Sequence, residues 1–471
     1  MEFDFTFILL AFLAVAAITT FLVKHFFKAD TWFLISLIKT KKPLPFFEKM
    51  AKHEKFIDIF AAVGLILGFG AVAVDYLFWG KLSRGKRIAL FIASTTALSF
   101  LVVLLDYFFG SIFSNNILIG GFYPVLVLSF GVMGLSGFAL FSLALQALDI
   151  VSKYLIGVRG CPGVAPLIPG VELPNVPITP PLHAWISLLI ILVVHEAMHG
   201  IVGKRHGFRL KSAGVLLLGF LPIGAFVEPD EKQVKKAKGE KLLPFLAAGP
   251  MANIALMVIA GLVVFGALAV IPPLTNSVFP GVQESIFSGV KVSSVLEDTS
   301  FCGSSYGSPA HGVLMEGDSI KAVNGAEVKN ISRLFNELQK NRFAEKTFSL
   351  ERGGEGLEVS MTPNALGQFG FVPGQIRNES FTIPQDYITY ALSAGLLVEF
   401  FYWLFLLSFL VAVINFLPMH PFDGGRIARV LFAPHLSFLG KSEAERQKIV
   451  EKFFLAFVLA LFIINALPLF F

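Results

Sequence analysis

Long runs of apolar residues, separated by short polar loops, dominate the chain. A membrane-spanning helix needs about 20 mainly apolar residues. Eight segments meet this requirement: 3–23, 56–79, 88–110, 117–151, 183–205, 242–271, 388–417 and 453–471. The segment 117–151 is long enough to tilt or to contain a re-entrant turn, and 388–400 is a candidate for a stretch along the membrane interface. The pattern predicts a polytopic α-helical membrane protein with about eight spans.

A short stretch after the fifth apolar segment has the pattern of strands instead. Residues 215–220 and 225–227 are predicted to be short strands, interrupted by Pro222 and Gly224. Strand edges are not tolerated in lipid, so this membrane-associated β element must be shielded by protein. An edge that pairs with an extended substrate and a structural hairpin are equally compatible with the pattern.

Residues 280–378 have the composition of a soluble domain. The pattern predicts strands, a helix of residues 331–340, and a closing hairpin around Gly353-Gly354. The order Gly-Val-x-Val, Ser-Pro-Ala, Gly-Asp-x-Ile, Val-Asn-Gly resembles that of a PDZ domain, with 299–307 as an insertion. We therefore expect an inserted PDZ-like α+β domain on the extracytoplasmic side, whose peptide groove the insertion could narrow.

The composition and charge agree with a membrane protein. Of 471 residues, 55% are hydrophobic and 15% are charged, against about 25% charged in soluble domains. The net charge of +5 comes from lysines and arginines in short loops, which indicates cytoplasmic loops better than nucleic-acid binding. The basic loops at 24–55, 204–211, 232–241 and 426–448 fit this rule. The basic loop at 80–87 does not, because eight spans place it outside.

Two further features concern the ends and the cysteines. Residues 3–23 lack a basic n-region and a small-residue cleavage site, so they are expected to be a retained span. The two cysteines, Cys161 and Cys302, allow at most one disulfide, which requires both to lie outside the cell. Cys161 lies in a Pro- and Gly-rich connection at 152–182 that is expected to be an ordered external loop.

The first polar cluster is His195-Glu196-Ala197-Met198-His199, near the end of an apolar segment. Positions i and i+4 share one helix face, so His195 and His199 can bind one zinc ion. Glu196, beside the metal, is placed to act on bound water. A chance occurrence on a buried helix is the alternative, but ionisable groups inside a span usually mark function.

A second polar cluster follows the seventh apolar segment, in Asn415-Phe416-Leu417-Pro418-Met419-His420-Pro421-Phe422-Asp423-Gly424-Gly425. A proline-broken segment near membrane depth is tolerable where it lines a cavity walled by protein. Asp423 is therefore predicted as the third zinc ligand, with water at the open fourth position. His420 is a rival ligand, and Asp423 could instead cap a helix.

The three separated motifs, His195 to His199, Gly249-Pro250-Met251-Ala252-Asn253, and Asn415 to Gly425, resemble those of the site-2 protease family, intramembrane zinc metalloproteases, in archaeal-like form. The resemblance covers about residues 180–450, including the stretch GFLPIGAFVEP and the PDZ-like insertion. Phe422 stands where the family usually has Leu.

The resemblance implies roles for individual residues. His195, His199 and Asp423 would bind one Zn²⁺ ion, and Glu196 would be the catalytic general base. Asn253 and Asn415 would support the substrate or the transition state. A strand would align the substrate; its residues are Gly219, Phe220, Leu221, Pro222, Ile223, Gly224, Ala225 and Phe226.

The predicted function is hydrolysis of peptide bonds within or near transmembrane segments, in regulated intramembrane proteolysis at the cell membrane. The expected partners are the lipid bilayer and transmembrane substrates that have already been cut outside the membrane; the oligomeric state is open. The alternatives are a metal-ion transporter and a non-catalytic PDZ-bearing scaffold. The expected division is 1–151 (accessory transmembrane helices), 152–182 (external loop), 183–275 and 386–452 (two halves of the catalytic core), 276–385 (PDZ-like domain) and 453–471 (last transmembrane helix).

Overall fold

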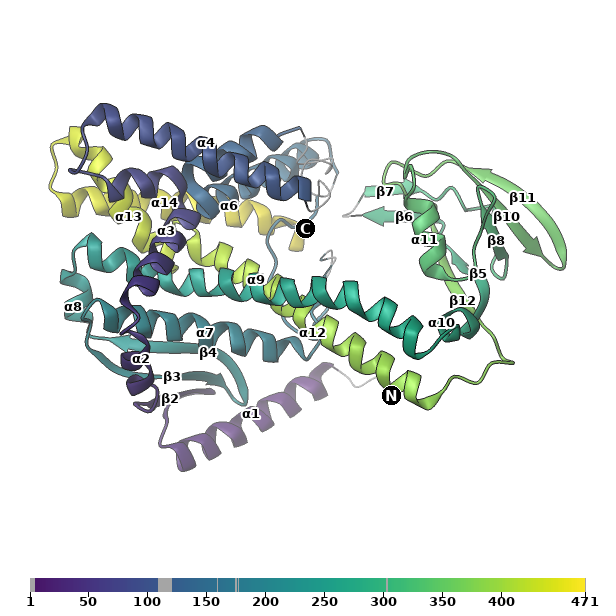
Figure 1. Ribbon diagram of the computed structural model, residues 1–471, viewed down its shortest axis with the longest axis horizontal. Coiled ribbons are helices and arrows are strands. Elements are labelled where there is room, and N and C mark those ends of the chain that lie inside the picture. The colour runs from purple at the N-terminus through teal and green to yellow at the C-terminus, as the bar shows by residue number, and fades with distance from the viewer. Residues whose placement is uncertain are drawn as a thin grey trace.

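The structure is a computed structural model that describes residues 5–108, 121–158, 160–173, 176, 178–301 and 304–470. It consists of a bundle of long helices and a separate β-rich unit, residues 287–377, which we call the soluble unit (Figure 1). The long helices are α1 (Phe5–Phe27), α3 (Glu54–Leu77), α4 (Arg84–Phe108), α6 (Tyr123–Leu155), α7 (Ala184–Arg205), α9 (Gly239–Val278), α12 (Gln385–Phe416) and α14 (Glu443–Ala466). Seven of them, α3 to α14, are long and apolar enough over their described residues to cross a membrane. The chain is thus a polytopic helical membrane protein. The eight expected spans overlap these helices over their described residues, and the number of spans stays a prediction.

Helices α7, α9 and α12 pack together through the middle of the bundle. α9 is one helix of 40 residues despite four internal prolines, and α12 is continuous from Gln385, so residues 388–400 belong to the long helix rather than to a separate interfacial stretch. α9 and α12 extend together to the soluble unit, at the right of Figure 1.

A four-stranded antiparallel sheet lies beside α7, with α1 on its outer side (Figure 1). Its strands, in spatial order, are β1 (Asp30–Trp32), β2 (Ile35–Thr40), β3 (Leu210–Leu218) and β4 (Leu221–Pro229). Gly219 has a φ of +59°, which suits the tight turn between β3 and β4. The expectation that residues 215–220 form one strand is therefore wrong at its end, since Gly219 and Phe220 form the turn. Pro222 and Gly224 do not interrupt β4 but lie within it.

Helix α3 is sharply broken at Gly70, whose φ of 55° and ψ of −141° are not helical. Asp58 near the start of α3 and Lys81 just beyond its end line one cavity of about 460 Å³, together with His206 and Glu240. Both ends of α3 therefore lie at the same end of the bundle. This arrangement gives a physical reason for the basic loop at 80–87, which fits no straight crossing by residues 56–79.

The soluble unit is an antiparallel sheet with one short helix against it. The sheet order is β11 (Glu355–Met361), β10 (Lys346–Arg352), β8 (Ser319–Val323), β5 (Phe287–Val295) and β12 (Phe371–Arg377), with β9 (Ala326–Glu327) paired to β8. Helix α11 (Ile331–Gln339) contacts β8 and β12, and Asn330 caps it by accepting a hydrogen bond from Arg333 N. The predicted helix at 331–340 and the hairpin around Gly353-Gly354 are confirmed. The expected insertion contains the hairpin of β6 (Asp298–Phe301) and β7 (Ser304–Gly307).

Short elements complete the described part of the chain: α2 (Leu44–Met50), α8 (Glu231–Lys236), α10 (Val282–Ile286), α13 (Asp423–Phe432), η1 (Ala433–Leu439) and η2 (Leu467–Leu469). α8 begins where the Asp230 carboxylate accepts hydrogen bonds from two backbone N–H groups, and α14 begins with a capping box of Ser442 and Glu445. Cys161 is disulfide-bonded, and Cys302 lies outside the described residues.

Candidate metal centre

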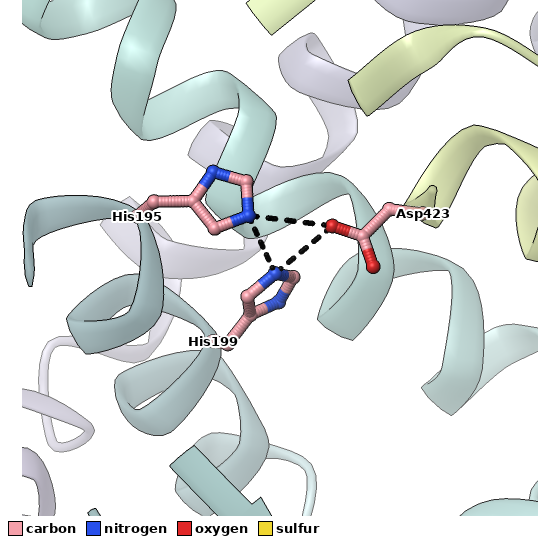
Figure 2. A group of neighbouring side chains, drawn as sticks. All are labelled: His195, His199 and Asp423. Atoms are coloured by element: carbon pink, nitrogen blue, oxygen red, sulfur yellow. Dashed lines mark hydrogen bonds and ion pairs between the residues drawn. The ribbon is translucent and has the colours of Figure 1, made fainter. Parts of the chain in front are cut away.

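Two histidines on α7 and one aspartate at the start of α13 converge on a single point (Figure 2). His195 and His199 are one helical turn apart, and their Nε2 atoms are 3.1 Å from each other. Asp423 Oδ2 is 3.0 Å from the Nε2 atom of His199 and 3.4 Å from that of His195. Both histidine residues are more than nine-tenths buried. Two histidines and an aspartate more than 220 positions later in the chain thus form one group able to hold a metal ion.

The sharp turn between α12 and α13 brings Asp423 to this point. A Cβ atom on Gly424 would lie 2.4 Å from the carbonyl oxygen of Leu417, and one on Gly425 would lie 2.5 Å from the carbonyl carbon of Met419. These contacts are too close for any side chain, so the two glycines let α13 begin directly against the end of α12. Asp423 is then the first residue of α13 and faces α7.

The three distances fit a tetrahedral metal. In a tetrahedral zinc site with Zn–N bonds of about 2.0–2.1 Å, neighbouring ligand atoms are roughly 3.3 Å apart. The observed separations of 3.1, 3.0 and 3.4 Å are close to this value. Two imidazole nitrogens and one carboxylate oxygen are also the usual ligands of a catalytic zinc ion.

The other ring nitrogens of the two histidines are held by neighbouring groups. His199 Nδ1 donates to the carbonyl oxygen of Phe245 at 2.7 Å, which leaves its Nε2 lone pair free for a metal. Asn253 Nδ2 lies 3.0 Å from His195 Nδ1, while Asn253 Oδ1 is buried without a hydrogen-bond partner. A 180° flip of this amide pairs Oδ1 with a protonated Nδ1 of His195 and satisfies both groups. With the amide assigned in this orientation, Nδ1 of His195 carries the proton and its Nε2 lone pair is free for a metal.

Glu196 lies beside the three converging side chains. Its carboxylate accepts a hydrogen bond from the backbone N–H of Val227 in β4, at 2.9 Å. A cavity of about 320 Å³ is lined by Glu196, His195, His199 and Asp423 and by residues of β4, α12 and α13. The glutamate, the three converging residues and an edge strand therefore share one cavity.

The other predicted site residues have different positions. Asn415 lines the cavity and donates to the carbonyl of Val411. His420, the rival ligand, is exposed and is not part of the cluster. In the predicted substrate strand, Phe226 lines the cavity, whereas Gly219 and Phe220 lie in the turn at the far end of β4.

Some residues have a role at the site that the sequence does not indicate. Gly249 opens one of the three motifs, but its contact with the imidazoles does not follow from the sequence. A Cβ atom on Gly249 would lie 2.4 and 2.5 Å from the Nε2 atoms of His199 and His195, so this position must be glycine for the imidazoles to fit. The Phe245 carbonyl carries no signal in the sequence, because any residue supplies one. Arg426 lines the cavity, whereas the sequence indicates only that it belongs to a basic loop.

Comparisons with known proteins find relatives that are similar to part of this chain. An uncharacterized protein of Methanocaldococcus jannaschii is 30% identical over 252 residues, covering 52% of this chain and 56% of that protein. A probable membrane metalloprotease of Arabidopsis thaliana chloroplasts, ARASP2, is 29% identical over 210 residues, covering 39% of this chain and 44% of that protein. The related chloroplast membrane metalloprotease ARASP is 27% identical over 208 residues, with the same coverages. The chain spans about half the length of the curated relatives it matches.

The model of peptidase family M50 matches residues 183–461, which is more than half of the chain and includes all three motifs and the converging residues. The resemblance to the site-2 protease family is thereby confirmed, and the chain belongs to peptidase family M50.

Proposed function

We propose that the protein is an intramembrane zinc metalloprotease that hydrolyses peptide bonds in or near transmembrane segments. The observation that carries this proposal is the convergence of His195, His199 and Asp423 beside Glu196 in one cavity. A structural zinc site normally has four protein ligands. Among the described residues three gather here, which leaves a coordination position for water or substrate.

In this mechanism His195, His199 and Asp423 would hold one zinc ion. When bound, the ion would supply Lewis-acid chemistry, which lowers the pKa of water and polarises a carbonyl. Glu196 would be the general base that accepts a proton from the attacking water and returns it to the leaving amine. Asn253 and the Phe245 carbonyl keep the two imidazoles in the binding tautomer and orientation. Asn415, at the wall of the cavity, is available to donate to the substrate or to the developing oxyanion.

The substrate would bind as an extended strand against β4. β4 is the edge of its sheet, with β3 on one side only. The N–H of Val227 points away from β3 towards Glu196. By strand alternation the N–H of Ala225 shares that direction, up to the register shift between Gly224 and Pro222. A peptide paired there would run past Glu196 and the converging ligands. This supports strand addition over a purely structural hairpin.

The soluble unit would recognise the substrate outside the membrane, as a PDZ-like domain. A cavity of about 370 Å³ lies between α11 and the start of β12, lined by Phe335 and Leu338 of the helix and by Phe371 of the strand. β12 is an edge strand. A groove between a helix and an edge strand fits an extended peptide, such as the free end of a substrate already cut outside. This unit would then favour trimmed substrates.

The decisive experiment is cleavage of transmembrane peptides by the purified protein. Wild-type protein should cleave, lose activity with a zinc chelator, and regain it with added zinc. Glu196→Gln should lower kcat by about 10²–10⁴-fold while zinc remains bound. Cleavage by Glu196→Gln at the wild-type rate, or cleavage by wild type that survives complete removal of metal, would refute the proposal. Zinc transport into vesicles without cleavage would favour a transporter.

A further inference from the structure

Helix α3 precedes the segment that matches the M50 family, yet it contacts the chain on both sides of Asp423. On the N-terminal side the contact is with Phe416, the last residue of α12. A Cβ on Gly68 would lie 2.2 Å from the Phe416 ring. Phe69 packs edge-on against the same ring, with centroids 6.3 Å apart and both residues fully buried. Phe416 therefore sits in a site formed by the first part of α3.

On the C-terminal side the contact is with His435 of η1, through a compact charged cluster. Arg87 of α4 donates two hydrogen bonds to the Asp75 carboxylate of α3, at 2.8 and 2.6 Å. His435 Nε2 lies 3.5 Å from the same carboxylate. Trp79 stacks on the Arg87 guanidinium at 3.6 Å and packs edge-on against His435. The side chains of Asp75 and Arg87 are 7% and 17% exposed.

The break at Gly70 sets the position of these two contacts relative to each other. A Cβ on Gly70 would lie 2.7 Å from the carbonyl oxygen of Gly131 and from the N atom of Gly134, both in α6. In return, a Cβ on Gly134 would lie 2.2 Å from the Leu67 carbonyl oxygen. Gly134 is itself a non-helical break, with a φ of 58°. Two broken helices thus meet backbone to backbone, and α3 is held in one bent shape.

We propose that α3 is the element that positions Asp423, and that Asp75 and Arg87 are positioning residues acting through His435. The inference rests on the proposed function, in which Asp423 is a ligand. α3 holds the chain at Phe416 and at His435, so the intervening turn and α13 have little freedom to move. A ligand must be held to within about 0.5 Å of its productive place, and a loosened carboxylate would bind the metal less tightly.

The test compares variants of the buried pair with variants of a matched pair elsewhere. Arg87→Lys keeps the positive charge but removes the bidentate hydrogen bonding to Asp75. Arg87→Met removes the charge and the hydrogen bonds. The control is Arg352→Lys, because Arg352 also donates two hydrogen bonds to a buried aspartate, Asp318, in the soluble unit. The double variant Asp75→Asn/Arg87→Gln replaces the ion pair by an amide pair and should restore function in part.

Zinc affinity is measured by competition with a chelator on the purified full-length protein, together with kcat, KM and thermal stability. Arg87→Lys and Arg87→Met should weaken zinc binding by up to about 10-fold, the low end of the loss for direct partners of metal ligands, because Arg87 acts on Asp423 only through Asp75 and His435. They should also lower kcat with little change in KM. Arg352→Lys should leave zinc affinity unchanged. Amide hydrogen exchange of α13 in the metal-free protein should rise in the Arg87 variants and fall back in the double variant.

Wild-type zinc affinity and unchanged exchange in α13, in folded Arg87 variants, would overturn the inference. A loss of thermal stability with unaltered zinc affinity in the folded fraction would do so too, because it would show a merely structural role. If wild type itself binds no zinc, the proposed function fails. The exchange of α13 then still decides whether Asp75 and Arg87 order the segment that carries Asp423.

Discussion

At the scale of single residues, the site depends on the missing side chain of a glycine and on a buried amide as much as on the ligands. Gly249 faces both imidazoles with only a hydrogen atom. Asn253 is completely buried and pairs with one ring nitrogen of His195. Such residues do no chemistry themselves, but they decide whether His195 and His199 can hold a common position.

Gly249→Ala should weaken zinc binding by about 10–100-fold or more, the loss seen when groups that orient metal ligands are disturbed. The new methyl group would lie 2.4 and 2.5 Å from the two Nε2 atoms, so the rings must shift by about 1 Å, beyond the tolerance of about 0.5 Å for a functional side chain. Equilibrium zinc binding measures the effect. The control is Gly266→Ala on the same helix, where no atom lies within 4 Å of the new Cβ. Equal zinc affinity in the two variants would contradict this role for Gly249.

Asp318 should make the soluble unit sensitive to acid. The hydrogen bonds from the Arg352 guanidinium hold the pKa of the Asp318 carboxyl below its ordinary value. A lowered folded-state pKa adds stability at pH above the unfolded value of about 3.9. This stability is lost as the pH falls through the folded-state pKa.

Amide exchange of β8 and β10, corrected for intrinsic rates at pH 6, 5, 4 and 3, measures this loss. Asp318→Asn should cost about 1–3 kcal/mol at neutral pH and flatten the acid dependence. Glu355 is an exposed residue of β11, so Glu355→Gln should leave the stability at neutral pH and its acid dependence unchanged. An acid dependence that persists in Asp318→Asn would assign it to other groups.

At the scale of elements, β4 is the strand that can align a substrate, because its free edge contacts Glu196 through the N–H of Val227. β1, β2 and β3 lie on the side of β4 away from the cavity, so a partner strand that enters the cavity can pair only with β4. The hydrogen bond from Val227 to Glu196 fixes which N–H groups of β4 face that partner.

Ala225→Pro removes one of these N–H groups without breaking the pairing with β3, because proline is tolerated on an edge strand. Losing one substrate hydrogen bond, worth about 1 kcal/mol, should lower kcat/KM for peptide cleavage about 5–10-fold while zinc binding stays unchanged. Ala225→Val, which keeps the N–H, is the control. Unaltered kcat/KM in Ala225→Pro would remove β4 from substrate alignment.

At the scale of the whole molecule, the bent α3 brings the loops at its two ends to one end of the helix bundle. Lys81 and Asp58 line one cavity with His206 and Glu240. The basic loop at 80–87 therefore joins the other basic loops, as the distribution of positive charge favours.

Cysteine labelling in a background with both native cysteines replaced by serine tests this arrangement. A membrane-impermeant maleimide should modify Lys81→Cys and Lys235→Cys from the same side, and Glu355→Cys in the soluble unit from the other. Lys235 and Lys81 are both exposed. Labelling of positions 81 and 355 from one side would show that α3 crosses the membrane instead.

The sequence by itself determined the membrane helices, the His195-Glu196 cluster and the approximate strands of the soluble unit. These depend on local properties: apolar length, helical spacing and alternation. It also favoured Asp423 over His420, through the broken backbone around it. The role of each site residue stays a prediction.

Only the tertiary structure decided the rest. Asp75 and Arg87 look like scattered charges until folding places them on His435, and Gly70 looks like any helix glycine until it meets Gly134. β2 pairs with β3 across more than 170 residues of sequence, Thr40 with Ala213 and Ile35 with Leu218. Contacts between distant segments depend on how helices bend and pack, and no local pattern in one chain encodes that.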